Sequence, residues 1–291
     1  MESLESGFQH HEIRLADLEL HYVREGKKGS PLLLLHEPDG FWWDWSRNIG
    51  ALSEYFDVIV PDLRGCGRSG KPPVDKDMPY HADKVTEDMV QLLQALEIRE
   101  AFVVGHGWST IVVHKMIRRQ RELVRRAVML NAALPGVEDF IASNRAHSWY
   151  LSFVQSDLAT ALIRSGRQAC EAFIRSRLSH GSANAEAFDE RDIQLYADNL
   201  MEPGTLPALQ AFYRTNLAPH SNLWKGMDKT VSSCNVTFLQ GVKDPFFPAE
   251  WVSLASRWYN RGSFEYLPDA GHYLMREAPE WVNYRLRLLK T

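Results

Sequence analysis

The sequence is poor in cysteine, has no excess of positive charge and contains no apolar run long enough to cross a bilayer. Its three cysteines, Cys66, Cys170 and Cys234, show neither zinc-site nor disulfide-framework spacing, so we expect a reducing compartment and a cytoplasmic protein. The formal net charge of -4 argues against a nucleic-acid partner. The N-terminal residues lack a basic region followed by an apolar stretch, so we expect neither secretion nor membrane insertion.

The composition that remains is that of an ordinary globular protein, with 45% hydrophobic and 24% charged residues. A chain of 291 residues suits an α/β core with an inserted subdomain. We expect a small-molecule, apolar substrate, no membrane contact, and a monomer or homodimer. The histidines, among them His10 and His11, lack metal-ligand spacing, so neither a metal nor a cofactor is expected.

Short apolar runs alternate with segments of helical periodicity, which predicts a mostly parallel sheet flanked by helices. Residues 12–25 predict two edge strands joined by a turn near Ala16 and Asp17. The further predicted strands are 31–36, 56–61, 101–104, 126–131, 235–240 and 263–267, and the predicted helices are 49–55, 85–96, 110–121 and 279–289. Residues 135–228 contain helical stretches without strand-like runs, which predicts a helical cap between two core segments, 1–134 and 229–291.

Residues 101–110 read as a buried strand, a tight turn and the start of a helix, the pattern of a nucleophile elbow. The apex of this elbow is Gly107, so the position that should present a nucleophile has no side chain. Ser109 lies two residues further on, inside the first helical turn, and is therefore not expected to replace it. His106, just before the apex, is expected to position the loop.

Two downstream residues stand where a hydrolase of this topology needs its acid and its histidine. Asp244 follows one predicted strand and His272 follows the next, and catalytic groups of parallel sheets gather at such strand ends. Asp244 could orient the imidazole of His272, whose other nitrogen would then take a proton from water. Taken singly, each residue would suit a turn or a loop equally well.

These motifs resemble the epoxide hydrolase and haloalkane dehalogenase branch of the α/β-hydrolases over nearly the whole chain. The residues that carry the resemblance are 31–36 with Trp42 and Trp45, 62–69, 103–108, 241–244 and 271–272. The resemblance implies an α/β-hydrolase fold with an inserted helical cap. Members of that branch usually have aspartate at the position of Gly107.

The predicted cap favours epoxide hydrolases within this branch. Segments around Tyr150 and Tyr213 resemble those that supply two tyrosines in epoxide hydrolases, where they would donate hydrogen bonds to the epoxide oxygen. Core packing is the alternative role for each tyrosine. Trp108 would suit a halide site, but Pro38 stands where many dehalogenases have asparagine, which disfavours that reading.

The segment from His36 to Gly40 departs from the family pattern. Pro38 lies at the position whose N–H commonly completes the oxyanion hole, and proline has no N–H, so either Trp108 alone or Trp108 with Asp39 would supply the donors. Glu37 and Asp39 are extra carboxylates. We expect them in a solvated turn, with a displaced base or ligand-binding group as the alternative.

Three hypotheses explain Gly107. The first is an epoxide hydrolase whose catalytic aspartate was replaced by glycine as an engineered change, to disable the enzyme or preserve bound substrate, with activity expected to return in Gly107→Asp. The second is a natural enzyme in which His272 directs water at an epoxide or lactone. The third is a non-catalytic binding protein whose pocket is lined by aromatic residues such as Trp42, Trp43 and Trp149.

Overall fold

The computed structural model describes residues 7–26, 28–74, 78–134, 149–217 and 231–290. Their strands form one eight-stranded sheet in the order β1-β2-β4-β3-β5-β6-β7-β8. The strands are β1 (His10–Arg14), β2 (Glu19–Glu25), β3 (Ser30–Leu35), β4 (Phe56–Pro61), β5 (Ala101–His106), β6 (Val124–Leu130), β7 (Val236–Gly241) and β8 (Gly262–Leu267). The predicted α/β class is confirmed.

In sheet order the strands are parallel from β4 through β8, and the antiparallel pairings are those of β2 with β1 and with β4. β2 pairs antiparallel with both β1 and β4, so of these first two strands β1 alone lies at an edge, and the expectation of two edge strands is wrong for β2. The second half of β2 pairs with β4, with Tyr22 opposite Pro61 and Glu25 opposite Val58. The carboxyl ends of the parallel strands therefore meet at one edge of the sheet.

Alternate leucines of β3 enter two different hydrophobic clusters. Leu32 and Leu34 pack in a cluster with α1 and α12, whereas Leu33 and Leu35 pack in another with α2 and α3. This is the period-two pattern of a strand buried on both faces. The covering helices are α1 (Ser46–Ser53), α12 (Pro279–Arg287), α2 (Ala82–Ala95) and α3 (Thr110–Arg119).

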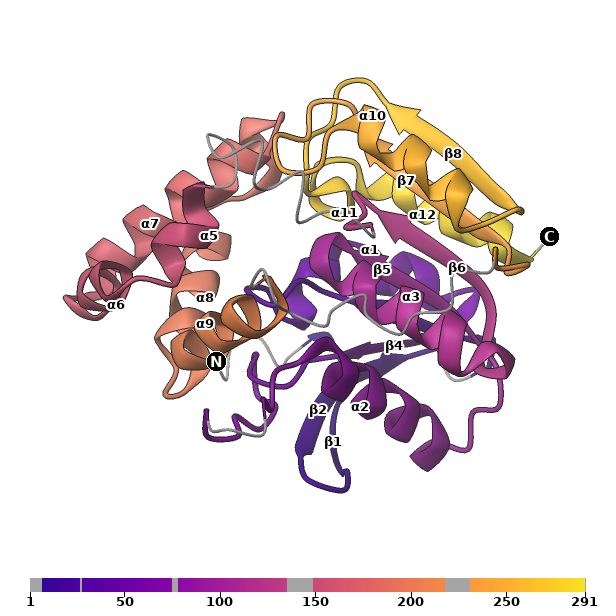
Figure 1. Ribbon diagram of the computed structural model, residues 1–291, viewed down its shortest axis with the longest axis horizontal. Coiled ribbons are helices and arrows are strands. Elements are labelled where there is room, and N and C mark those ends of the chain that lie inside the picture. Colours follow the sequence, from indigo (N-terminus) through magenta and orange to yellow (C-terminus); the bar gives the residue numbers. More distant parts are fainter. Residues whose placement is uncertain (1–6, 27, 75–77, 135–148, 218–230, 291) are drawn as a thin grey trace.

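Among the described residues between β6 and β7, five α-helices form a separate layer beside the sheet, at the left of Figure 1. They are α5 (Trp149–Val154), α6 (Asp157–Arg164), α7 (Arg167–Gly181), α8 (Glu190–Met201) and α9 (Thr205–Leu217). The two predicted cap boundaries, at residues 135 and 228, lie outside the described residues. We refer to α5–α9 as the cap.

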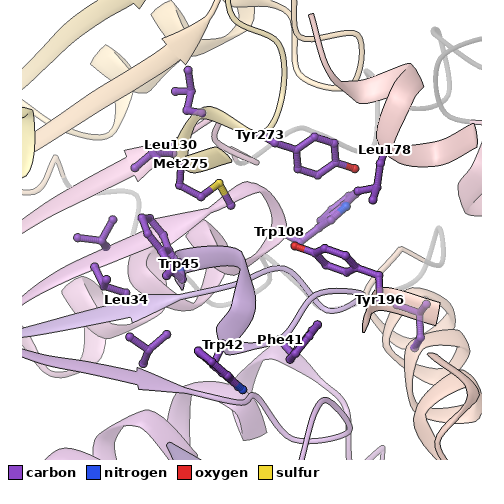
Figure 2. Close-up of a cluster of buried hydrophobic side chains, with 14 of the residues drawn as sticks. Leu34, Phe41, Trp42, Trp45, Trp108, Leu130, Leu178, Tyr196, Tyr273 and Met275 are labelled. Carbon is purple, nitrogen blue, oxygen red and sulfur yellow. The ribbon is translucent and has the colours of Figure 1, made fainter. Parts of the chain in front are cut away.

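The cap shares one hydrophobic cluster with the sheet. Leu178 of α7 and Tyr196 of α8 belong to the same cluster as Trp108, Leu34 and Trp45, and Figure 2 draws these side chains together. Hydrogen bonds reinforce the contact, because the Tyr196 hydroxyl donates to Asp44 at 2.5 Å. The cap is therefore held against the strand ends where the predicted catalytic residues lie.

The remaining elements are short. They are η2 (Trp42–Trp45), η3 (Gly107–Ser109), η4 (Arg121–Leu123), η5 (Ala185–Ala187), α10 (Ala249–Val252), η6 (Ser253–Arg257), α11 (Leu274–Glu277) and η7 (Leu288–Lys290). All three cysteines are buried and form no disulfide. Among the described helices, none combines the length and apolar character needed to cross a membrane.

Candidate active site

The predicted elbow is present between β5 and α3. Gly107 begins the short turn η3 and has a φ of +52°, in the left-handed region that glycine adopts readily. The buried Ser109 hydroxyl accepts the His106 N–H at 2.9 Å and lies 3.1 Å from the carbonyl oxygen of Leu35. Ser109 thus fixes the turn, and its oxygen is directed at the backbone.

The space above Gly107 is occupied by the side chain of Glu37. A Cβ on residue 107 would overlap the Glu37 carboxylate. The Trp108 N–H donates to Glu37 Oε1 at 3.0 Å, and Glu37 is only 2% exposed. The expectation of a solvated turn is therefore wrong for Glu37, because its carboxylate points inward and is paired with buried donors.

A β-turn directs Glu37 into this position. The Gly40 N–H donates to the Glu37 carbonyl at 2.9 Å, which places Pro38 and Asp39 at the two central positions of the turn. Proline favours the first central position because its φ is fixed. Pro38 has no N–H to donate, and at this position it stabilises the turn that carries Glu37.

His272 lies between two carboxylates. Its Nδ1 is 2.9 Å from Asp244 Oδ2 and its Nε2 is 3.1 Å from Glu37 Oε2. Burial by itself would lower the pKa of His272, but the two carboxylates more than offset it and raise the pKa to about 10. The resting imidazole is therefore protonated and donates a hydrogen bond to each side.

Glu37 is correspondingly held in its ionised form. Burial is the largest single influence and opposes the charge, but the attraction of His272, helped by His106 and Arg177, outweighs it and lowers the pKa of Glu37 below its ordinary value. The elbow thus has an ionised carboxylate directly above Gly107, and that carboxylate comes from the end of a different strand.

Asp244 is fixed by donors on both of its oxygens. The N–H groups of Phe246 and Phe247 donate to Oδ1 at 2.7 and 3.1 Å, and the Asn131 amide donates to Oδ2 at 2.5 Å. Asn131 was not among the predicted site residues. It is a polar residue directly after the apolar strand β6, and that position was the available sign of a site role.

Arg177 of α7 is a second group that the sequence analysis missed. Its side chain is 7% exposed, pairs with Asp39, and reaches Glu37 Oε2 at 3.5 Å. It also donates to the Tyr273 hydroxyl at 2.8 Å. Arg177 lies on the buried stripe of α7, where an apolar residue would be ordinary, so a charge on that stripe was the available signal.

Asp39 belongs to the same buried cluster, and the expectation of a solvated turn is wrong for it too. Its side chain is 10% exposed. Burial raises its pKa, Arg177 lowers it and Glu37 raises it again, with a result of about 6. Two acidic residues and one arginine are therefore packed together at the cap–sheet contact.

The two predicted tyrosines lie on the cap side of the site. Tyr150 of α5 and Tyr213 of α9 are buried, with ring centroids 6.4 Å apart, and Tyr213 packs 6.1 Å from Trp108. The Arg177 guanidinium carbon lies 5.3 Å from the Tyr150 ring centroid, which joins this pair to the charged cluster. Among the described residues, the buried Tyr213 hydroxyl has no hydrogen-bond partner.

His106 lies against the ring of His272, with a centroid separation of 4.6 Å. Its Nε2 donates to the His272 carbonyl at 2.8 Å, which leaves Nδ1 as an unpartnered acceptor among the described residues. Burial is the main reason that the pKa of His106 falls to about 4. The hydrogen bond ties the residue before the elbow apex to the loop that carries His272.

Glu37, His106 and His272 bring ligand atoms within 4.8 Å of one another, so this group could hold a metal ion. A metal-bound histidine must give up a proton at the ligating nitrogen. In the present arrangement His272 donates both nitrogens to carboxylates. These hydrogen bonds therefore favour proton sharing between His272 and the two carboxylates over binding of a metal ion.

Two predicted binding residues, Trp149 and Trp42, make their contacts away from His272 and Glu37. Trp149 is 40% exposed and packs on Phe153. Trp42 is buried against Phe8 and its backbone N–H donates to Asp62 at 2.7 Å, so it supports the loop after β3. Neither contact is with His272 or Glu37.

Comparison with known proteins gives one consistent fold. A sequence model of the family described as alpha/beta hydrolase fold matches residues 31–279. A soluble epoxide hydrolase from Corynebacterium sp. (strain C12) is 31% identical over 287 residues, covering 94% of each chain. Epoxide hydrolase 3 from Xenopus tropicalis is 28% identical and covers 96% of this chain and 77% of its own length.

A solved structure agrees in fold. The Bacillus megaterium epoxide hydrolase, crystallised with an inhibitor, superposes with a TM-score of 0.83 at 22% identity, covering 97% of this chain and all of that one.

Proposed function

The chain belongs to the α/β-hydrolase family, and within it we propose that this protein adds water to small apolar epoxides. The observation that carries the proposal is the buried Tyr213 hydroxyl, which has no hydrogen-bond partner among the described residues and lies in a site that also holds the His272–Asp244 pair. A buried unpartnered hydroxyl is unfavourable for folding, so a binding site for a substrate oxygen explains it. Relatives at 28–31% identity named as epoxide hydrolases support the same reaction.

The tyrosines supply the acid for ring opening. Burial raises the pKa of Tyr150 and of Tyr213, so both phenols stay protonated at neutral pH. As the epoxide C–O bond breaks, a phenol donates its proton to the developing alkoxide. His272, oriented by Asp244, is placed to activate water once its own proton has been given up during ring opening.

The contacts of Glu37 argue against an inactivated site. Without aspartate at position 107, the elbow retains a buried carboxylate from Glu37 and the Trp108 N–H beside it. The hypothesis of water bound in the vacated space is disfavoured for the same reason, because that space is filled. A working hydrolase is the function that these contacts support.

The test is conversion of styrene oxide and phenyl glycidyl ether to their diols, followed by chromatography, with a six-membered lactone as a second substrate class. We expect diol formation by the native protein and its loss in Asp244→Asn. The matched control is Asp269→Asn, because Asp269 is in the same C-terminal region with a side chain 91% exposed. Saturable binding of both epoxides without any diol would support the binding-protein alternative, and turnover of the lactone alone would redirect the proposal to lactone hydrolysis.

A further inference from the structure

We propose that Glu37 is the nucleophile of this enzyme, a carboxylate that reaches the elbow from the loop after β3 instead of from the elbow apex. The inference rests on the proposed hydrolase function. It follows from three contacts of Glu37: its overlap with any side chain at position 107, its hydrogen bond from the Trp108 N–H, and its contact with His272.

The two oxygens of Glu37 have different surroundings, which assigns them different roles. Oε1 accepts the Trp108 N–H at 3.0 Å, and this donor would stabilise the oxyanion formed when water attacks an ester. Oε2 lies 3.1 Å from His272 Nε2, on the side where the base must act. Oε2 is therefore the atom that attacks the epoxide, and Oε1 becomes the ester carbonyl oxygen.

The first half-reaction forms a covalent ester. Oε2 of Glu37 forms a bond to an epoxide carbon, the C–O bond of the ring breaks with its electrons on oxygen, and Tyr213 protonates that oxygen. The His272 imidazolium then gives its proton to the Tyr213 phenolate. The products are a hydroxyalkyl ester of Glu37, neutral Tyr213 and neutral His272, so charge and protons balance.

Loss of the Glu37 charge prepares the second half-reaction. Two carboxylates raise the pKa of His272 in the resting site, and esterification removes one of them, so the neutral imidazole becomes available as a base. His272 takes a proton from water while the hydroxide oxygen attacks the ester carbon. Collapse of the adduct breaks the bond to the diol oxygen, and the diol leaves with one proton while Glu37 and the His272 imidazolium are restored.

The neighbouring Asp39 is the less suitable carboxylate. It forms its ion pair with Arg177, and its pKa of about 6 leaves part of it protonated near neutral pH. Glu37 combines an ionised carboxylate with a hydrogen bond from the elbow N–H. Glu37 and Asp39, only two positions apart, therefore differ in their suitability as the nucleophile.

The test traps the ester in the variant His272→Gln, which keeps the elbow but lacks the base. This variant is mixed with phenyl glycidyl ether, and its intact mass and peptide masses are measured. We expect a mass increase of one epoxide per chain, located on Glu37 by fragmentation and absent from His272→Gln/Glu37→Gln. The matched control His272→Gln/Glu12→Gln alters a surface glutamate whose side chain is 49% exposed, and should label fully.

A second arm follows oxygen. In a single turnover of the native protein in ¹⁸O-water, attack by water on the ester places the label in the Glu37 carboxylate and leaves the first diol unlabelled. Direct attack of water on the epoxide places the label in the diol and leaves the Glu37 carboxylate unlabelled. We also expect Glu37→Gln to lose activity by about a thousand-fold or more, the scale of removing a catalytic nucleophile.

The outcomes distinguish this inference from the proposed function. Diol formation with ¹⁸O in the product and no adduct on Glu37 overturns the nucleophile assignment and leaves the hydrolase proposal intact. An adduct on Glu37 without diol formation by the native protein supports the nucleophile and overturns the hydrolase. The absence of both adduct and diol overturns both.

Discussion

Gly107 and Glu37 occupy one functional position between them. Gly107 supplies the left-handed backbone of the elbow, with a φ of +52°, and Glu37 supplies the carboxylate above it. The two residues come from the ends of β5 and β3, which are neighbours in the sheet. The glycine is thus explained by its partner, because a side chain at position 107 would displace the carboxylate.

This complementarity predicts the result of placing aspartate at position 107. Gly107→Asp alone is expected to destabilise the fold by about 1–3 kcal/mol, the typical cost of overpacking, and to give no gain in diol formation. Gly107→Asp with Glu37→Gly returns the carboxylate to the apex and makes room for it. We expect that double variant to exceed Glu37→Gly in activity by at least about tenfold, measured as kcat/KM with phenyl glycidyl ether.

Gly107→Ala is the steric control for that comparison. It introduces the same Cβ without a carboxylate, so it should lose stability like Gly107→Asp and should gain nothing from Glu37→Gly. A Gly107→Asp single variant that is stable and more active than the native protein would contradict the shared-position argument.

The ion pair between Glu37 and His272 predicts how stability depends on pH. The folded-state pKa of His272, about 10, is above its unfolded value of 6.5, so the folded protein binds the proton more tightly. This contribution to stability is complete below pH 6.5 and is lost as the pH rises through about 10. Urea unfolding at pH 6, 8 and 10 should show the decline.

Variants isolate the contribution of His272 from other titrating groups. Glu37→Gln removes one of the carboxylates that raise the pKa of His272, so the decline between pH 6 and 10 should be shallower in this variant. Asp269→Asn, an exposed change, should leave the slope unaltered. Equal slopes in native protein and Glu37→Gln would show that the pair does not stabilise the imidazolium.

Tyr213→Phe is expected to separate activity from stability. The Tyr213 hydroxyl has no hydrogen bond among the described residues, so deleting it removes no folded-state contact and should leave the melting temperature unchanged or slightly higher. Activity should fall by about ten- to a hundredfold, because Tyr150 still provides one acid. Calorimetry and diol formation measure the two effects.

Tyr196→Phe is the matched control. Tyr196 is also a buried cap tyrosine, but its hydroxyl donates to Asp44 at 2.5 Å, so its loss leaves a buried acid without this donor. We expect Tyr196→Phe to lower stability by about 1–3 kcal/mol. The two variants should therefore change stability in different ways despite the same chemical deletion.

Arg177 is expected to be needed chiefly because it neutralises buried acids. Arg177→Met leaves Asp39 buried beside Glu37 without its cation, which should cost about 3–5 kcal/mol of unfolding free energy. Adding Asp39→Asn removes one unpaired charge, so the double variant should be more stable than Arg177→Met alone. Urea unfolding of the four proteins in this cycle gives the coupling, and additive effects would disprove the pairing.

The predicted strands and helices were confirmed where apolar periodicity was strong. The run of leucines from Leu32 to Leu35 could only be a strand buried on both faces, and β3 is that strand. The location of Asp244 and His272 at neighbouring strand ends was also predictable, because parallel strands place their carboxyl ends at one edge. The local sequence pattern was sufficient to predict both the strand and the positions of these two residues.

The roles of Glu37 and Arg177 could not be read in the same way. Glu37 was expected in solvent because Glu-Pro-Asp-Gly is the composition of an exposed turn, and that local argument holds for the turn itself. The inward direction of the Glu37 side chain depends on the Trp108 N–H, on His272 and on the space left by Gly107. Arg177 reaches Asp39 only when the cap lies against the sheet.

The sequence by itself therefore determined the α/β layering, the elbow with its glycine apex, and the acid and histidine at successive strand ends, because each depends on periodicity or on residues close along the chain. Tertiary structure alone decided that Gly107 and Glu37 share one position, since they are 70 residues apart and meet only when β3 and β5 pair. It also decided that His272 is charged, because the pKa of a buried imidazole depends on which carboxylates the fold brings to it.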